Sequence, residues 1–264
     1  MKGLRHFLLA LQFFTRVPVT GALARWVGFS PEMLRASAAH FPGVGWLVGA
    51  LAAAVFVVAQ AGLPGWPGAL AAAFLSTTAT VLMTGAFHED GLADVADGLG
   101  GSAERERALE IMKDSRIGAF GAIALVLALG LKCALLALLA AGGAKAVAAA
   151  LLAAHVLSRL APLFLIRGLP HVGDTATSKS KPLADAIGWP ALAVAVGWSL
   201  PAMLLLAWSF GSPHAAAAIV SCTVAAAWMA RLFRRRLQGF TGDALGATQQ
   251  VCEIAVYLAL AWRA

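Results

Sequence analysis

The sequence predicts an all-α integral membrane protein, a polytopic bundle of six or seven transmembrane helices. Of its 264 residues, 60% are apolar and only 12% are charged, and the mean hydropathy is +0.80. Soluble domains have about 45–50% apolar and about 25% charged residues. A soluble globule could not hide this much apolar surface behind 33 charged side chains. The composition also excludes a disordered chain, a collagen-like chain and a disulfide-rich secreted domain.

Apolar runs of membrane-spanning length predict the individual helices. A spanning helix needs about 20 apolar residues, and six segments have that length: 41–62, 66–87, 118–140, 144–166, 187–209 and 214–233. A seventh, from Val251 to Trp262, has only 12 residues and spans only if it extends back toward Gly246. The first 20 residues predict an amphipathic or re-entrant helix. Because no repeat or extramembrane domain is evident, we expect residues 1–264 to form a single domain.

The distribution of basic residues predicts the orientation. Alternating spans place four connecting segments on one side of the bilayer: 1–40, 88–117, 167–186 and 234–250. These segments and their edges carry 16 of the 20 Lys and Arg residues, and the positive-inside rule makes that side cytoplasmic. The net charge of +7 therefore reflects topology, and we expect no nucleic-acid partner. Within the spans, His155 and Arg159 share a helical face, whereas Lys132 is expected to reach the interface with its long side chain.

An acidic stretch follows the second span and predicts a metal site. If that span continues as a helix, Asp90, Asp94 and Asp97 share one narrow face at positions i, i+4 and i+7. Carboxylates placed in this way repel one another, and a divalent cation removes the penalty. Oxygen ligands without Cys or His favour Mg²⁺ or Mn²⁺. The alternative is a solvated acidic loop. Glu89 points about 100° away from this face and is a weaker ligand candidate.

Metal-assisted phosphate chemistry also needs cations and a proton acceptor. Lys113 with Arg116 and Lys179 with Lys181 are candidate phosphate-binding pairs on the cytoplasmic side. A further basic run, at positions 231 and 234–236, is better explained as a topological anchor on anionic lipid. Asp243, framed by glycines, is a candidate fourth metal ligand or general base, or else the N-cap of a helix.

The chain resembles the cobalamin synthase family, the adenosylcobinamide-GDP ribazoletransferases of the bacterial cobalamin pathway. Five stretches carry the resemblance, in the order in which the family has them: Phe14–Pro18, Phe41–Gly45, Asp90–Gly98, Met112–Gly121 and Thr241–Ala247. They extend from one end of the chain to the other. The pattern DGxxDxxDG alone is modest evidence, because CDP-alcohol phosphotransferases have similar aspartates. The Lys-Asp-Ser-Arg and Thr-Gly-Asp stretches are more specific.

The resemblance implies the reaction and the substrates. A hydroxyl of α-ribazole, or of its 5′-phosphate, attacks the pyrophosphate of adenosylcobinamide-GDP, and GMP leaves. The implied cofactor is Mg²⁺, and the implied location is the bacterial inner membrane with the site facing the cytoplasm. The sequence leaves open the state of the acceptor, the base that it bears, the number of metal ions and the oligomeric state, and a homo-oligomer is compatible with it.

Together, residues and resemblance give each candidate a role. Asp90, Asp94 and Asp97 are the expected Mg²⁺ ligands. Catalytic roles are expected for Asp94, for Asp114 and for Asp243, the last two by completing the metal shell or accepting the hydroxyl proton. The expected phosphate contacts are Lys113, Arg116, Lys179 and Lys181.

Two alternatives remain at this point. A CDP-alcohol phosphotransferase shares the metal chemistry but has an Arg shortly after the second Asp-Gly, where this chain has Gly98-Leu99-Gly100-Gly101. A transporter places its polar residues near the bilayer midplane on broken helices, whereas this chain concentrates them at one face.

Overall fold

The computed structural model describes residues 2–173 and 187–262, and these fold into helices. Four helices precede or connect the predicted spans on the side of the acidic stretch: α1 (Lys2–Phe14), α2 (Gly21–Val27), α3 (Pro31–Ser37) and α7 (Arg105–Ile111). The acidic stretch itself forms α6 (Phe87–Gly101). The long apolar helices are α4 (Phe41–Gly62), α5 (Gly65–Thr84), α8 (Ala119–Leu139), α9 (Ala144–Gly168), α11 (Trp189–Phe210), α12 (Ser212–Arg236) and α13 (Gly242–Ala261).

Seven helices among the described residues are long and apolar enough to cross a membrane, so the chain is a multi-pass membrane protein. The predicted all-α bundle is confirmed, with the larger of the two predicted helix numbers. The seventh helix, α13, reaches back beyond Gly246 to Gly242 and is therefore 20 residues long. The N-terminal amphipathic helix is present as α1, which buries Leu9, Leu11 and Phe14.

Helix α9 forms the centre of the bundle, with 17 of its 25 residues buried. Helix α4 packs closely against it through Gly45 and Gly49. A Cβ atom at Gly45 would lie 2.4 Å from the carbonyl oxygen of His155, and one at Gly49 would lie 2.9 Å from the Cα of Leu152. Small residues at this spacing allow two membrane helices to approach until their backbones touch.

The outer helices present apolar side chains that no part of the described chain covers. Val126 on α8, Leu204 on α11 and Trp208 on α11 are 72%, 70% and 85% exposed. Exposed apolar surface on this scale indicates contact with lipid rather than water. The bilayer therefore surrounds α8, α11 and α12.

The second span does not continue into the acidic stretch, which corrects the sequence-based expectation for residues 66–87. Helix α5 ends at Thr84, and Gly85 and Ala86 both have left-handed backbone with φ of 70° and 60°. The left-handed backbone favours glycine at position 85, whereas the nearest side chain, that of Arg16, is exposed and can move. The chain restarts as α6 in a new direction.

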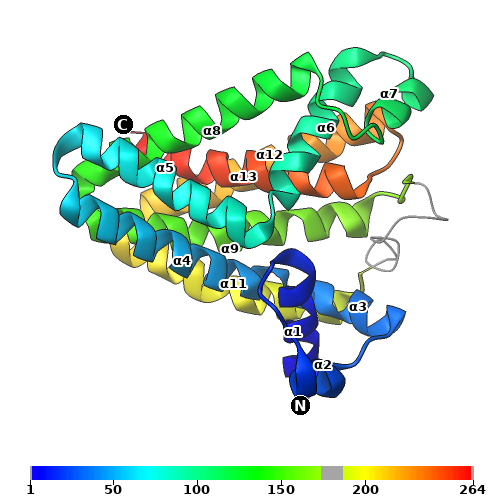
Figure 1. The fold of residues 1–264 in the computed structure, drawn as a ribbon, viewed down its shortest axis with the longest axis horizontal. Helices are drawn as coiled ribbons and strands as arrows, with labels where there is room; N and C mark the ends of the chain where they lie inside the picture. Colours follow the sequence, from blue (N-terminus) through cyan, green and yellow to red (C-terminus); the bar gives the residue numbers. More distant parts are fainter. Residues whose placement is uncertain (1, 174–186, 263–264) are drawn as a thin grey trace.

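The long connections and the short connections lie at opposite ends of the bundle, as the distribution of basic residues predicted. In Figure 1 the short α4–α5, α8–α9 and α11–α12 connections lie at one end, and α6, α7 and the α12–α13 connection lie at the other. The polar, chemistry-bearing segments are thus gathered at one end of the molecule.

Candidate active site at the α6–α13 crossing

Helix α6 carries the predicted aspartates at increasing depth. Asp90 is exposed, Asp94 is half-buried, and Asp97 is only 8% exposed. The prediction of one shared helix for these residues is correct, although that helix is separate from the second span. Glu89 points away from them as expected, since it is buried and accepts a hydrogen bond from Nε2 of Gln250 at 3.0 Å.

A close crossing of α6 and α13 brings Asp243 to these aspartates. A Cβ atom at Gly91 would lie 2.8 Å from the backbone oxygen of Asp243, and one at Gly246 would lie 3.3 Å from the Cα of His88. The two glycines therefore allow direct backbone contact. As a result Asp243, which is far from Asp90 in sequence, joins the acidic face of α6.

The charges in this cluster act on Asp94. Partial burial, together with the negative charges of Asp243, Asp90 and Asp97, raises the pKa of Asp94 to about 7. No basic side chain among the described residues offsets these charges at Asp94. A divalent cation with a preference for oxygen ligands fits this donor set in kind. Among the described residues, however, no three Asp, Glu, His or Cys side chains converge closely enough to form a complete metal site.

Asp97 has a structural partner of its own. Its two carboxylate oxygens accept backbone N–H groups from Gly118 at 2.7 Å and from Gly121 at 2.8 Å. These are two of the N–H groups at the start of α8 that lack a partner within the helix, and the N-cap residue, Gly118, has no side chain to cap them. Asp97 thus caps α8 from a neighbouring helix. Its expected role as a Mg²⁺ ligand stays a prediction.

The N-cap of α13 is Thr241, so the alternative N-cap assignment for Asp243 is wrong. The Thr241 hydroxyl accepts the backbone N–H of Ala244 at 3.2 Å and donates to Oδ2 of Asp243 at 3.4 Å. This arrangement leaves the Asp243 carboxylate in the first turn of α13, where the helix dipole stabilises negative charge.

The Lys-Asp-Ser-Arg stretch follows α7 and forms its own ion pair. Arg116 donates to both oxygens of Asp114, with the shortest distance at 2.6 Å, and 87% of the Arg116 side chain is exposed. This guanidinium lowers the pKa of Asp114 to about 2. Lys113 is exposed beside them. Lys179 and Lys181 lie outside the described residues.

A buried polar network lies behind the aspartates, within the bundle, and sequence reasoning missed its centre. Glu253 of α13 pairs with Nζ of Lys132 at 2.6 Å and accepts hydrogen bonds from Gln249 at 2.7 Å and Tyr257 at 3.1 Å. Nδ1 of His155 lies 3.4 Å from the same carboxylate. The expectation that Lys132 reaches the interface is therefore wrong, because Lys132 is 1% exposed. The sequence did contain a sign of this network, because Glu253 lies inside an apolar run and an acid in that position needs a buried basic partner.

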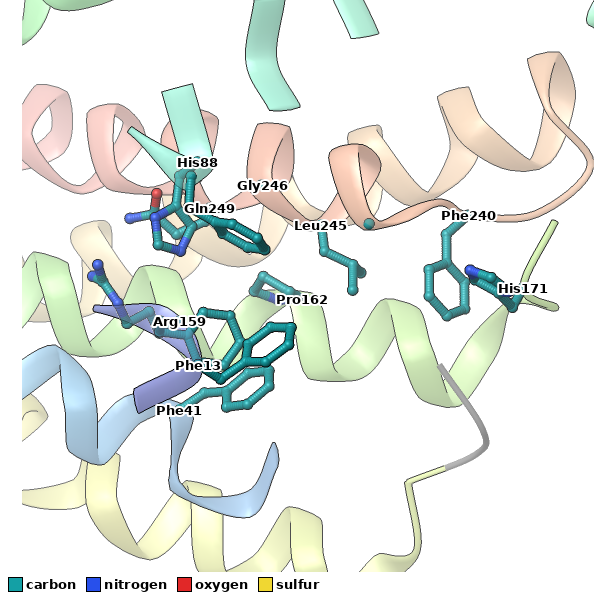
Figure 2. Close-up of a pocket in the computed structure, with 13 residues that line it drawn as sticks. Phe13, Phe41, His88, Arg159, Pro162, His171, Phe240, Leu245, Gly246 and Gln249 are labelled. Atoms are coloured by element: carbon teal, nitrogen blue, oxygen red, sulfur yellow. The ribbon is translucent and has the colours of Figure 1, made fainter. Parts of the chain in front are cut away.

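Arg159 links this network to a pocket. The guanidinium of Arg159 donates to the carbonyl oxygen of His155 at 3.0 Å and lies 3.2 Å from its Nδ1. The pocket contains about 570 Å³ of empty space, part of it open to solvent. Figure 2 shows His88 and Arg159 at one end of the pocket, Phe240 and His171 at the other, and Pro162 and Leu245 between α9 and α13. Gly242 and Gly246, on either side of Asp243 in the sequence, also line it.

A comparison with models of protein families identifies the family of this chain. A family model described as Cobalamin-5-phosphate synthase matches residues 6–261. The chain belongs to the cobalamin-5-phosphate synthase family. The match covers the whole bundle, so membership favours the expected enzyme over the phospholipid enzyme and the transporter.

Individual relatives in the cobalamin-5-phosphate synthase family agree. The chain is 60% identical to the adenosylcobinamide-GDP ribazoletransferase of Polaromonas sp. (strain JS666 / ATCC BAA-500), over 97% of this chain and 96% of the relative. It is 61% identical to the enzyme of that name from Albidiferax ferrireducens, over 98% of both chains. Identity to the one from Vibrio cholerae is 42%, over 97% and 93%. No solved structure matches the chain significantly.

In this member of the cobalamin-5-phosphate synthase family, the structure thus brings together Asp90, Asp94 and Asp243 at the crossing of α6 and α13. Asp97 adjoins them but is held by α8. Asp114 is paired with Arg116.

Proposed function

We propose that this chain is an adenosylcobinamide-GDP ribazoletransferase, which joins α-ribazole or its 5′-phosphate to adenosylcobinamide-GDP and releases GMP. The observation that carries the proposal is the high identity to ribazoletransferases over nearly the whole of both chains. The acidic cluster at the polar end of the bundle supports it from the side of chemistry.

The reaction balances as a phosphoryl transfer. The acceptor hydroxyl forms a new P–O bond to the phosphorus that carries the cobinamide, and the bond between that phosphorus and the bridging oxygen breaks. The bridging oxygen leaves with GMP, and a protein carboxylate takes up the hydroxyl proton. Asp243 suits the last role better than Asp114, because the ion pair with Arg116 keeps the pKa of Asp114 at about 2 and makes it a weak base.

Mg²⁺ is the proposed cofactor, with Asp90 and Asp94 as its main ligands and Asp243 or Asp97 as the additional ones. The fit rests on the kind of donors: half-buried or exposed carboxylates that repel one another and raise the pKa of Asp94. When bound, the ion would neutralise charge on the diphosphate and on the leaving GMP. The close contact at Gly91 keeps the carboxylate of α13 beside those of α6.

The remaining phosphate charge requires basic side chains. Lys113 and Arg116 follow α7 and are exposed at the polar end, so they can bind phosphate oxygens from solvent. Lys179 and Lys181 are proposed for the same role from the sequence alone. The uneven distribution of basic residues supports a location in the bacterial inner membrane with this end in the cytoplasm.

Purified full-length protein in liposomes tests the proposal. The mixture contains adenosylcobinamide-GDP, α-ribazole and Mg²⁺, and chromatography follows GMP and the cobamide product. We expect GMP release that EDTA abolishes, and a decrease by about two orders of magnitude or more in Asp94→Asn. Glu104→Gln is the matched control, because Glu104 is exposed and its side chain makes no capping hydrogen bond.

Two outcomes would contradict the proposal in different ways. Absence of turnover in a folded wild-type preparation refutes the reaction. Full activity of Asp94→Asn refutes the aspartate site while leaving the reaction intact.

A further inference from the structure

The pocket beside Asp243 has walls of aromatic rings. Phe14 packs edge-on against Phe41 with ring centroids 4.0 Å apart, and it lies 5.7 Å from Phe87 and 6.2 Å from the ring of His88, to which it is nearly parallel. Phe13 adds a further ring 5.9 Å from Phe87. Rings in these arrangements offer faces and edges to another planar aromatic group.

The far end of the pocket is fixed by backbone pairing. The N–H of Val172 donates to the carbonyl oxygen of Phe240 at 2.9 Å, and the N–H of Phe240 donates to that of Pro170 at 2.9 Å. The rings of His171 and Phe240 also pack with centroids 5.4 Å apart. The segment that follows α9 is thereby tied to the segment that precedes α13, which gives the pocket a defined length.

The polar end of the pocket is Arg159. This side chain is 4% exposed, and its Nε–H has no hydrogen-bond partner among the described residues. An unsatisfied buried donor is costly, and it indicates a ligand that brings an acceptor atom. A lipid acyl chain fits the apolar walls but has no such acceptor.

Size and polarity distinguish the parts of the two proposed substrates. A corrin macrocycle with its substituents is much larger than a pocket of about 570 Å³ that includes its open mouth. The edge of guanine carries several donors and acceptors, and the accessible surface of the pocket, although His88, Arg159 and Gln249 contribute to its lining, is almost entirely apolar and would leave most of them unsatisfied. Among the bases that the acceptor nucleoside could bear, one of the benzimidazole type is bicyclic, planar and mostly apolar, with one ring nitrogen free to accept a hydrogen bond.

We propose that this pocket binds the base of the acceptor nucleoside, stacked among the phenylalanine rings with its free ring nitrogen toward Arg159. The inference rests on the proposed function, since α-ribazole is the acceptor in that reaction. Gly242 and Gly246 line the pocket and flank Asp243 in sequence. A base held there keeps its ribose close to the carboxylates that act on the hydroxyl.

Substitutions that fill or open the pocket test the inference. Leu245→Phe fills its middle, and Phe87→Ala removes a wall ring that is 38% exposed and therefore not needed for the core. Leu258→Phe is the matched control, because Leu258 lies on the same helix as Leu245 but is 41% exposed to the surroundings of the bundle. Calorimetric titration of the full-length protein with α-ribazole gives the dissociation constant, and the GMP assay gives kcat and the KM of each substrate.

We expect both pocket variants to raise the Kd and the KM for α-ribazole by about tenfold. Phe87→Ala removes one aromatic contact with the base, and Leu245→Phe fills the space that the base would occupy. The KM for adenosylcobinamide-GDP should stay unchanged in both variants. The control variant Leu258→Phe should give the same Kd, kcat and KM values as the wild type. A merely structural defect would instead alter kcat and both KM values together.

The outcomes separate this inference from the proposed function. If the wild type turns over but both pocket variants bind α-ribazole as tightly as it does, the pocket assignment is overturned and the reaction stands. If the wild type binds α-ribazole and the variants weaken binding, but no GMP is released, the reaction is overturned and the pocket stands. A wild type that neither binds nor turns over refutes both.

Discussion

Replacement of Asp97 by Asn separates a structural role for this residue from a role in metal binding. The carboxylate accepts hydrogen bonds from the backbone N–H groups of Gly118 and Gly121 at the start of α8. An amide keeps one oxygen as an acceptor but turns an NH₂ group toward the second N–H, so one bond is lost and two donors face each other. The helix terminus also loses a nearby negative charge.

The expected magnitude follows from these contacts. Hydrogen bonds to charged groups contribute about 1.5–3 kcal/mol each, and a carboxylate at a helix N-terminus contributes about 0.3–1 kcal/mol more. The loss of one bond and the charge thus amounts to about 2–4 kcal/mol. For a chain of this size each kcal/mol lowers Tm by about 2–4 °C, so we expect Asp97→Asn to lower Tm by about 4–16 °C.

A thiol-reactive dye can follow the unfolding in detergent, because Cys133, Cys222 and Cys252 are buried and free. The buffer contains EDTA, so that no bound metal ion contributes to stability. Asp94→Asn is the control, since it is the same substitution one turn away on the same helix. Relief of repulsion in the acidic cluster predicts no loss of Tm there. Equal Tm values for the two variants would refute the capping role of Asp97.

Two further substitutions test the packing around the site in the same unfolding assay. Gly121→Ala places a Cβ atom 2.4 Å from a carboxylate oxygen of Asp97; we expect a loss of stability comparable to that of Asp97→Asn, and an unchanged Tm would contradict it. Lys132→Met leaves Glu253 buried without its cation, which predicts a loss of about 3–5 kcal/mol. Combining it with Glu253→Gln should restore part of that loss, and a double variant no more stable than the single one would argue against the ion pair.

The membrane class, the position of the spans and the shared face of Asp90 and Asp94 could be predicted from the sequence, because each depends on local pattern. Composition and run length report the spans directly, and the spacing of four residues reports the helical face. The break at Gly85 and Ala86 was not predictable in this way. Apolar residues continue across it, and nothing in the local pattern shows that the backbone becomes left-handed at Ala86 as well as at Gly85.

The rest of the site depends on contacts between distant segments. Asp243 joins Asp94 because Gly91 allows α13 to touch α6, and no local pattern contains that contact. Asp97 belongs to the same acidic stretch as Asp90 and Asp94, yet the N-cap glycine of α8 donates its backbone N–H to the Asp97 carboxylate. The spacing of these aspartates at i, i+4 and i+7 therefore predicted a common helical face but not a common function.

The same principle connects the buried network to the aspartates. Glu253 holds Lys132 of α8 and lies beside His155 of α9, so one carboxylate of α13 links the helix that Asp97 caps with the helix that carries Arg159. Buried ion pairs contribute little net stability but penalise strongly any arrangement that separates the partners. Such a network fixes the register of α13 against α8 and α9. Because Asp243 and the glycines of the pocket are on α13, that register also sets the position of the proton acceptor relative to the proposed base-binding pocket.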